Sequence, residues 1–278
     1  MILDSSNSGE VVVDMTKYVK DMIEDFENNL GEGCAKTPAA KWLFETRDKS
    51  QKLSEEKKQE FHTMVAKALF LCKRARPDIM TAVAFLTTRV QNPDEDDWKK
   101  LVRLMSYLKG TEELNLTLSA DNMNVCRWYV DASYAVHPDM RSHTGSIMTL
   151  GKGCIQAKSS KQKMNTKSST EAELIGGNDI LPDLLWTGYF LKAQGYDAYK
   201  SIMMRDNKSC MLLEENGMFS SSKRTKHINV RYFFMKDKID SGEVKIEYCP
   251  TEQMIGDFFT KPLQGEKFME FRKMILNL

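Results

Sequence analysis

Two aspartates, far apart in the sequence, follow short runs that have the pattern of β-strands. Asp131 follows Val125–Val130, and Asp206 follows Ser201–Arg205. In open α/β sheets, ligands bind outside the carboxyl ends of the strands, so both side chains are candidates for one shared site. Two carboxylates at adjacent strand ends repel each other unless a cation lies between them. The pattern therefore indicates a cation site.

Two further acids could complete this site. Glu173 lies near the start of a helix that should begin at Ser168, and Asp257 lies in an expected C-terminal helix. Glu171 is not expected to join Glu173, because at roughly 100° per residue the two side chains point about 200° apart. Carboxylate oxygens suit Mg²⁺, and two such ions about 4 Å apart can activate a water and stabilise the leaving oxygen of a phosphodiester. Capping and turn roles remain the alternative for each acid taken alone.

Two stretches that contain bases and no acids could bind phosphate. The whole chain has 278 residues and is almost neutral, with 40 Lys and Arg against 39 Asp and Glu, so only local charge can indicate such a partner. The alternative is an ordinary solvated surface. The first stretch lies within residues 158–167 and the second within residues 219–236, and their bases are Lys158, Lys161, Lys163, Lys167, Lys223, Arg224, Lys226, Arg231 and Lys236.

The elements that must position these residues form two groups. Residues 61–110 predict a compact helical unit, whose third helix has Asn92 as N-cap and Pro93 at its first position. After Asp121 the expected order is β-β-β-α-β-α-α-β-α, which is typical of an α/β domain with a mixed sheet. Its long helix contains Gly176-Gly177, each costing about 1 kcal/mol relative to alanine, which indicates either close packing or a decaying copy.

Composition excludes several classes of protein. Hydrophobic residues make up 41% and charged residues 28%, as in globular proteins. No apolar run approaches the roughly 20 residues that a membrane-spanning helix needs, and the first residues have no secretory-signal pattern. The six cysteines form no Cys-x-x-Cys pair, so neither a zinc site nor a disulfide framework is expected. We therefore expect a soluble intracellular protein with no membrane partner.

Several segments resemble the C-terminal polymerase region of copia-type retrotransposon polyproteins, and they occur in that family's order. Upstream, residues 76–79 and 98–111 resemble the thumb or connection that follows a reverse transcriptase palm. The downstream segments are Tyr129-Val130-Asp131-Ala132-Ser133, Ala157-Lys158-Ser159-Ser160-Lys161-Gln162, Lys167-Ser168-Ser169-Thr170-Glu171-Ala172-Glu173-Leu174, Asp206-Asn207-Lys208-Ser209, Lys223-Arg224-Thr225-Lys226-His227-Ile228 and Gly256-Asp257-Phe258-Phe259-Thr260-Lys261-Pro262-Leu263.

The resemblance implies a ribonuclease H-like mixed five-stranded sheet with flanking helices, preceded by a small helical unit. It implies a palm remnant at residues 1–31, a linker at 32–60, a helical thumb or connection at 61–118 and the ribonuclease H-like domain at 122–278. It places the catalytic and metal-binding carboxylates at Asp131, Glu173, Asp206 and Asp257. The implied substrate-binding residues are Lys158, Lys161, Lys163, Lys167, Asn207, Lys223, Arg224, Lys226 and His227.

The implied activity is hydrolysis of the RNA strand of an RNA/DNA hybrid with two Mg²⁺ ions, for which Mn²⁺ could substitute. The chain has no Tyr-x-Asp-Asp motif, so we expect no polymerase activity from this chain alone, and the missing palm and fingers are expected as partners in cis or in trans. The expected location is the cytoplasm, inside a virus-like particle, or the nucleus. Two alternatives stay open: a catalytically inactive remnant that serves as a nucleic-acid-binding or assembly module, and, more weakly, an integrase or resolvase acting on DNA.

Overall fold

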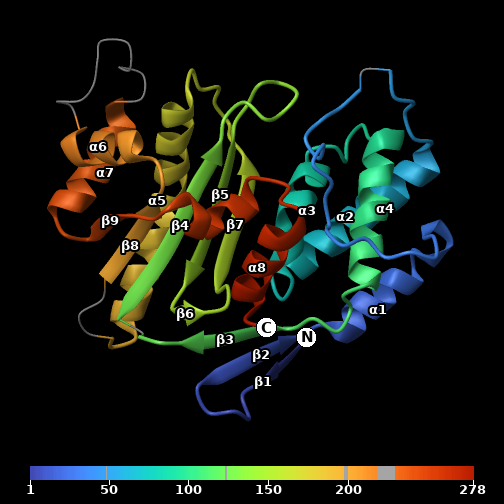
Figure 1. The fold of residues 1–278 in the computed structure, drawn as a ribbon, viewed down its shortest axis with the longest axis horizontal. Coiled ribbons are helices and arrows are strands. Elements are labelled where there is room, and N and C mark those ends of the chain that lie inside the picture. The colour runs from blue at the N-terminus through green and yellow to red at the C-terminus, as the bar shows by residue number, and fades with distance from the viewer. Residues whose placement is uncertain (48, 123, 197–199, 218–228) are drawn as a thin grey trace. The chain divides into compact units, whose positions relative to one another are not determined.

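The structure is a computed structural model that describes all residues except 48, 123, 197–199 and 218–228. Two compact units are formed (Figure 1). The first comprises Met1–Ser119, Lys152–Ser160 and Lys261–Leu278, and the second comprises Ala120–Gly151 and Lys161–Thr260. This division by compactness differs from the implied ribonuclease H-like domain of residues 122–278. The implied domain bounds therefore stay a prediction.

The first unit is mainly helical. Its N-terminal strands β1 (Ile2–Asp4) and β2 (Glu10–Asp14) pair antiparallel, and β2 pairs with β3 (Leu116–Ala120), which the sequence pattern did not indicate. Residues 32–60, expected as a linker, contribute buried side chains such as Leu43 and Leu53. The helices are α1 (Thr16–Glu24), α2 (Glu55–Cys72), α3 (Met80–Thr87), α4 (Glu95–Lys109) and α8 (Gly265–Leu276), with short 3-10 helices η1 (Glu27–Asn29) and η2 (Pro77–Ile79).

The start of α4 corrects one prediction. Asp94, rather than Asn92, is the N-cap, because its carboxylate accepts hydrogen bonds from the amides of Asp96 and Asp97. The Asp97 side chain in turn accepts a bond from the Asp94 amide, which completes a capping box. Pro93 therefore precedes the cap.

The mixed sheet that the sequence predicts lies in the second unit except for residues 156–160 of its edge strand, and the predicted fold class is confirmed. The strand order is β7-β5-β4-β8-β9. β4 pairs antiparallel with β5 and parallel with β8, and β8 pairs parallel with β9. The strands are β4 (Val125–Ser133), β5 (His143–Thr149), β7 (Gln156–Lys161), β8 (Lys200–Arg205) and β9 (Val244–Tyr248), while β6 (Gly151–Lys152) joins a second sheet with β1, β2 and β3.

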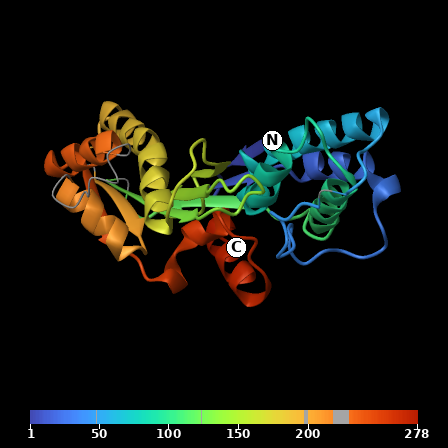
Figure 2. The ribbon, with the colours of Figure 1, turned by 90° about the horizontal axis from the view of Figure 1, so that it is seen from above.

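The long helix α5 (Ser169–Ala193) lies along one face of this sheet (Figure 2). Trp128 and Val130 of β4 belong to the same cluster of buried apolar side chains as Leu181 and Leu184 of α5. Because side chains alternate along a strand, Asp131 points away from this cluster. The helices α6 (Lys208–Asn216) and α7 (Asn229–Asp240) follow β8, and the 3-10 helices η5 (Thr251–Gln253) and η6 (Ile255–Phe259) replace the first part of the expected C-terminal helix.

The two adjacent glycines of α5 face different surroundings, which favours close packing over decay. A Cβ atom on Gly176 would lie 3.5 Å from Ala132 and Thr144, an ordinary contact distance. A Cβ atom on Gly177 would lie only 2.0 Å from Nη2 of Arg205, which is wholly buried. Only Gly177 is therefore required by its neighbours.

We expect alanine to have opposite effects at these two positions. Gly176→Ala should raise the free energy of unfolding by about 0.5–1 kcal/mol, because alanine is the better helix former and fits. Gly177→Ala should lower it by about 1–3 kcal/mol, because the new methyl group displaces a buried guanidinium. Urea denaturation of both variants beside the wild type measures the difference, and equal effects would contradict this explanation of the glycine pair.

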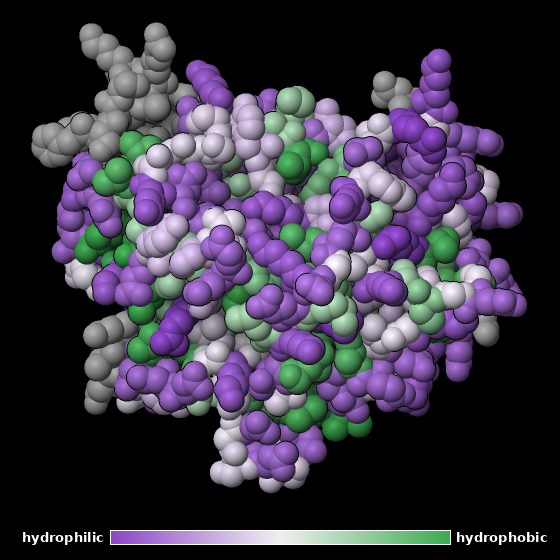
Figure 3. Space-filling model, viewed as in Figure 1, coloured by the Kyte–Doolittle hydropathy of each residue, from purple (hydrophilic) through white to green (hydrophobic). Residues whose placement is uncertain are grey.

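Hydrophilic residues dominate the face shown in Figure 3, and hydrophobic residues form only scattered areas on it. Among the described residues, no helix combines the length and hydropathy required to cross a bilayer.

Candidate metal centre

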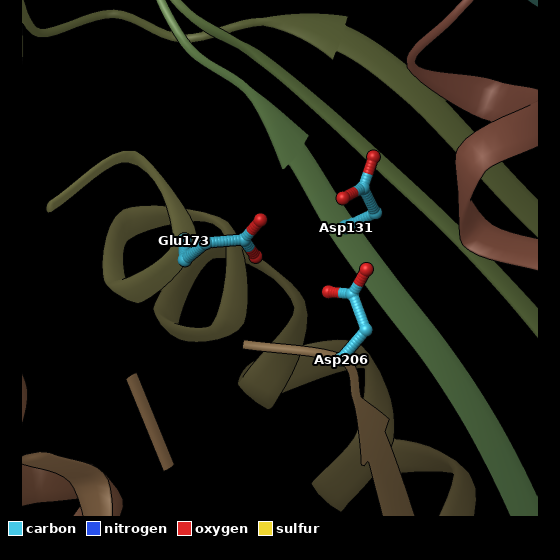
Figure 4. A group of neighbouring side chains, drawn as sticks. All are labelled: Asp131, Glu173 and Asp206. Carbon is cyan, nitrogen blue, oxygen red and sulfur yellow. The ribbon is translucent and has the colours of Figure 1, made fainter. Parts of the chain in front are cut away.

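Three carboxylates from three different elements meet at one end of the sheet (Figure 4). Asp131 lies on β4, Glu173 in the second turn of α5, and Asp206 directly after β8. One carboxylate oxygen of each lies within 4.8 Å of the others. Asp131 and Glu173 are buried, and Asp206 is half-buried. Three oxygen donors at this spacing fit a hard divalent cation such as Mg²⁺, which takes carboxylate ligands and keeps several waters.

The strand pairing explains why the two aspartates meet. β4 and β8 are parallel neighbours, so their carboxyl ends lie at the same edge of the sheet. β4 runs on to Ser133, three residues further than the sequence indicates, so Asp131 lies within the strand opposite Gly145. The hydroxyl of Thr260 donates a hydrogen bond to Asp131, and that of Thr251 donates one to Asp206 at 3.2 Å.

The start of α5 separates the roles of its two glutamates. Ser168 is the N-cap, and its hydroxyl accepts a hydrogen bond from the Glu171 amide at 3.2 Å. The Glu171 carboxylate accepts one from the Lys167 amide at 2.7 Å, so it caps the helix and lies outside the acidic group. Glu173 instead points at β4 and accepts a hydrogen bond from the Ala132 amide at 3.2 Å. Glu173, and not Glu171, therefore belongs to the group of three carboxylates.

The environment of Glu173 disfavours its ionised form. Burial raises its pKa well above the usual range, and the charges of Asp131 and Asp206 raise it further. The guanidinium of Arg205 and the Ala132 amide partly offset this. A cation among the three carboxylates would reverse the balance, since it would replace the repulsion by attraction.

Asp257, the fourth predicted carboxylate, is buried in η6 and lies outside the group of three. It is nevertheless nearby: a Cβ atom on Gly256 would lie 3.2 Å from Asp131. The pKa of the Cys249 thiol is raised to about 11 by burial, then by the charges of both Asp206 and Asp257. The role of Asp257 at the site stays a prediction.

The predicted substrate-binding residues have varied environments. Lys158 is half-buried in β7, whereas Lys163 and Lys167 are exposed. Lys161 forms an ion pair with Asp139 at 2.6 Å. Asn207 is the N-cap of α6, where its side chain accepts a hydrogen bond from the Cys210 amide at 3.0 Å. The remaining four residues lie outside the described part of the chain and keep their predicted role: Lys223, Arg224, Lys226 and His227.

Sequence reasoning missed a buried ion network behind the carboxylates. Arg205, wholly buried at the end of β8, forms ion pairs with Glu173 and with Glu214 of α6. Two features of the sequence could have indicated this network. One is a basic residue at the end of an otherwise apolar strand segment, and the other is a glycine pair in the helix that packs against that strand. Neither signal identifies the partner without the fold.

The chain is similar to several curated polyproteins. It is 27% identical over 279 aligned residues to the retrovirus-related Pol polyprotein from transposon TNT 1-94 of Nicotiana tabacum. The aligned region covers 99% of this chain and 21% of that protein. It is 32% identical over 202 residues to the corresponding polyprotein from transposon RE2 of Arabidopsis thaliana. That aligned region covers 72% of this chain and 14% of the relative. The chain thus spans about a fifth or less of these relatives. No protein-family model matches it.

Among solved structures, one match is LC11-RNase H1 isolated from compost, with a TM-score of 0.38 and 14% identity, covering 49% of this chain and 92% of that one. Another is the same protein in complex with an RNA/DNA hybrid, with a TM-score of 0.36 and 13% identity, covering 46% of this chain and 88% of that one.

Proposed function

Because the chain is related in sequence to the Pol polyproteins of copia-type transposons, we propose that it is a ribonuclease H fragment of such a polyprotein. It would hydrolyse the RNA strand of an RNA/DNA hybrid. The observation that carries the proposal is the meeting of Asp131, Glu173 and Asp206 within 4.8 Å at the carboxyl end of parallel strands. A structural or capping role does not account for three carboxylates held together, two of them buried.

In this proposal Asp131, Glu173 and Asp206 hold two Mg²⁺ ions, and Asp257 completes their surroundings. When bound, the ions supply activation of a water and stabilisation of the leaving oxygen of the phosphodiester. Asp131 is fixed by strand pairing and by Thr260, and Glu173 by the Ala132 amide, so little reorganisation is needed at the moment of reaction.

The basic residues would bind the backbone of the hybrid. Lys163 and Lys167 are exposed on the segment that leads into α5, the helix that carries Glu173. Phosphate contacts of this kind set the position of a duplex without reading its sequence. The 2′-hydroxyl groups of the RNA strand and the shape of the minor groove would then provide the selectivity for a hybrid. The polymerase palm and fingers that the family resemblance implies would be partners in cis or in trans.

Cleavage of an end-labelled RNA/DNA hybrid tests the proposal. The full chain should cut the RNA strand internally in the presence of Mg²⁺ or Mn²⁺, and should cut neither the DNA strand nor duplex RNA. Excess EDTA should stop the reaction, and added Mg²⁺ should restore it. Binding without cleavage would favour the inactive binding module instead, and cleavage of duplex DNA would favour the integrase or resolvase alternative.

A further inference from the structure

We propose that Arg205 is a positioning residue, which holds the carboxylate of Glu173 in the orientation needed to share a cation with Asp131. This inference rests on the proposed function, because it assigns to Arg205 a role in the same site. It goes beyond that function because Arg205 would act through Glu173 and would not itself contact substrate or metal.

Both carboxylate oxygens of Glu173 accept hydrogen bonds, one of them from Arg205. One carboxylate oxygen accepts a hydrogen bond from the Ala132 amide at 3.2 Å, and the other accepts one from Nη1 of Arg205 at 3.3 Å. The same Nη1 also donates to the carbonyl of Val130 at 3.4 Å. Val130 and Ala132 are the two neighbours of Asp131 in β4. Glu173 is thus tied to the strand on both sides of Asp131, once directly and once through Arg205.

Arg205 also fixes the helix backbone. Its Nη2 donates to the main-chain carbonyl of Glu173 at 3.1 Å. Both the carboxylate and the backbone of Glu173 are therefore held by one guanidinium, and a planar guanidinium can make such divergent bonds at once where an ammonium cannot. Because Arg205 directly precedes Asp206, the guanidinium links the strand, the helix and the strand end that carry the three carboxylates.

The surroundings of Arg205 accommodate its charge and its size. Glu214, 1% exposed, supplies a counter-charge to Nη2. Gly177 leaves the space for that nitrogen, since a Cβ atom there would lie 2.0 Å from it. A buried arginine with no carboxylate partner is costly, so Glu214 explains why the cation is tolerated. Glu214 alone would neutralise the charge of Arg205, however. Charge balance therefore does not explain the additional bonds from Arg205 to Glu173 and Val130.

The decisive experiment measures Mn²⁺ binding by electron paramagnetic resonance, with thermal unfolding in EDTA as the measure of folding. The double variant Arg205→Met/Glu214→Leu removes both buried charges together, a replacement that is often neutral for stability. We expect it to unfold near the wild-type temperature and to bind Mn²⁺ at least tenfold more weakly, because an unheld glutamate must lose rotamer freedom when it binds the ion. Equal or tighter binding overturns the proposal.

Two single variants separate charge from geometry. Arg205→Lys keeps the positive charge but cannot make all the bonds, so it too should bind Mn²⁺ more weakly, and wild-type affinity would overturn the proposal even if the double variant fails to fold. Glu214→Gln is the matched control, since it leaves the three bonds of Arg205 to Val130 and Glu173 in place. It should lower the unfolding temperature without weakening Mn²⁺ binding; weakening equal to that of Arg205→Lys would overturn the proposal.

The Mn²⁺ measurement involves no nucleic acid, so its outcome is independent of the cleavage assay. A wild-type chain that binds Mn²⁺ but cuts no hybrid would refute the proposed function and still allow the role of Arg205 to be judged. A wild-type chain that binds no Mn²⁺ would overturn the role of Arg205 as well.

Discussion

Asp131→Asn is expected to abolish metal-dependent cleavage of an RNA/DNA hybrid while the protein stays folded. Asparagine has the shape of aspartate and can still accept the hydrogen bond from Thr260, so the strand and its neighbours should be preserved. It lacks the negative charge that a shared cation requires. We expect kcat/KM to fall by about three orders of magnitude or more, a typical result when a central metal ligand is lost.

The measurement is single-turnover cleavage of labelled hybrid, together with Mn²⁺ titration of the same protein. Glu171→Gln provides a matched control on the helix of the site, because Glu171 lies outside the group of three carboxylates. It should leave cleavage and Mn²⁺ affinity within about threefold of the wild type and cost about 0.5–1 kcal/mol of stability through the weakened cap. Wild-type Mn²⁺ binding by Asp131→Asn would remove Asp131 from the proposed metal site.

Much of the candidate site was predictable because it depends on local patterns. An apolar run followed by an aspartate indicates a strand and its carboxyl end, which identified Asp131 and Asp206. The angular spacing of a helix separated Glu173 from Glu171. The parallel pairing of β4 and β8 then brings the two aspartates together, as the α/β order suggested.

The missed features depend on partners that are distant in the sequence. The strand β3 is short and is stabilised by pairing with β2, which no local pattern shows. In the sequence, Arg205 is only one charged residue in a strand. Its contacts depend on the packing of α5 and α6 against β8, which local patterns do not show. Asp257 was expected in a C-terminal α-helix, whereas its segment forms the 3-10 helix η6, which packs against β4 and β5.

A second large effect is expected from Glu173→Gln, which should stabilise the metal-free protein and at the same time remove its metal-dependent activity. Burial and the charge of Asp131 raise the pKa of Glu173 well above its usual value near 4.5. The folded state therefore binds a proton more tightly than the unfolded state does. As the pH rises from the unfolded-state pKa to the folded-state pKa, the unfolded state loses its proton first, and the folded protein becomes less stable.

The free energy of unfolding that the wild type loses in this way is about 1.4 kcal/mol for each pH unit between the unfolded-state and folded-state pKa of Glu173. The loss is complete above the folded-state pKa. Glutamine has no proton to lose, and its one side-chain oxygen can keep one of the two hydrogen bonds that the carboxylate accepts, from the Ala132 amide or from Arg205. In EDTA, Glu173→Gln should therefore be more stable than the wild type near neutral pH, and the two should converge near pH 4.5. Urea denaturation across this pH range measures both.

Added Mg²⁺ should reverse the order of stability near neutral pH. The ion binds the folded wild type and stabilises it by mass action, whereas the variant lacks one of the three carboxylates and gains less. This crossing distinguishes a functional site from a merely unfavourable cluster, because a cluster that no cation occupies would give the same order with and without Mg²⁺. If Glu173→Gln were instead less stable than the wild type in EDTA, the ion pair with Arg205 would outweigh the burial of the charge. The three carboxylates would then be held together by the protein alone, without need of a metal.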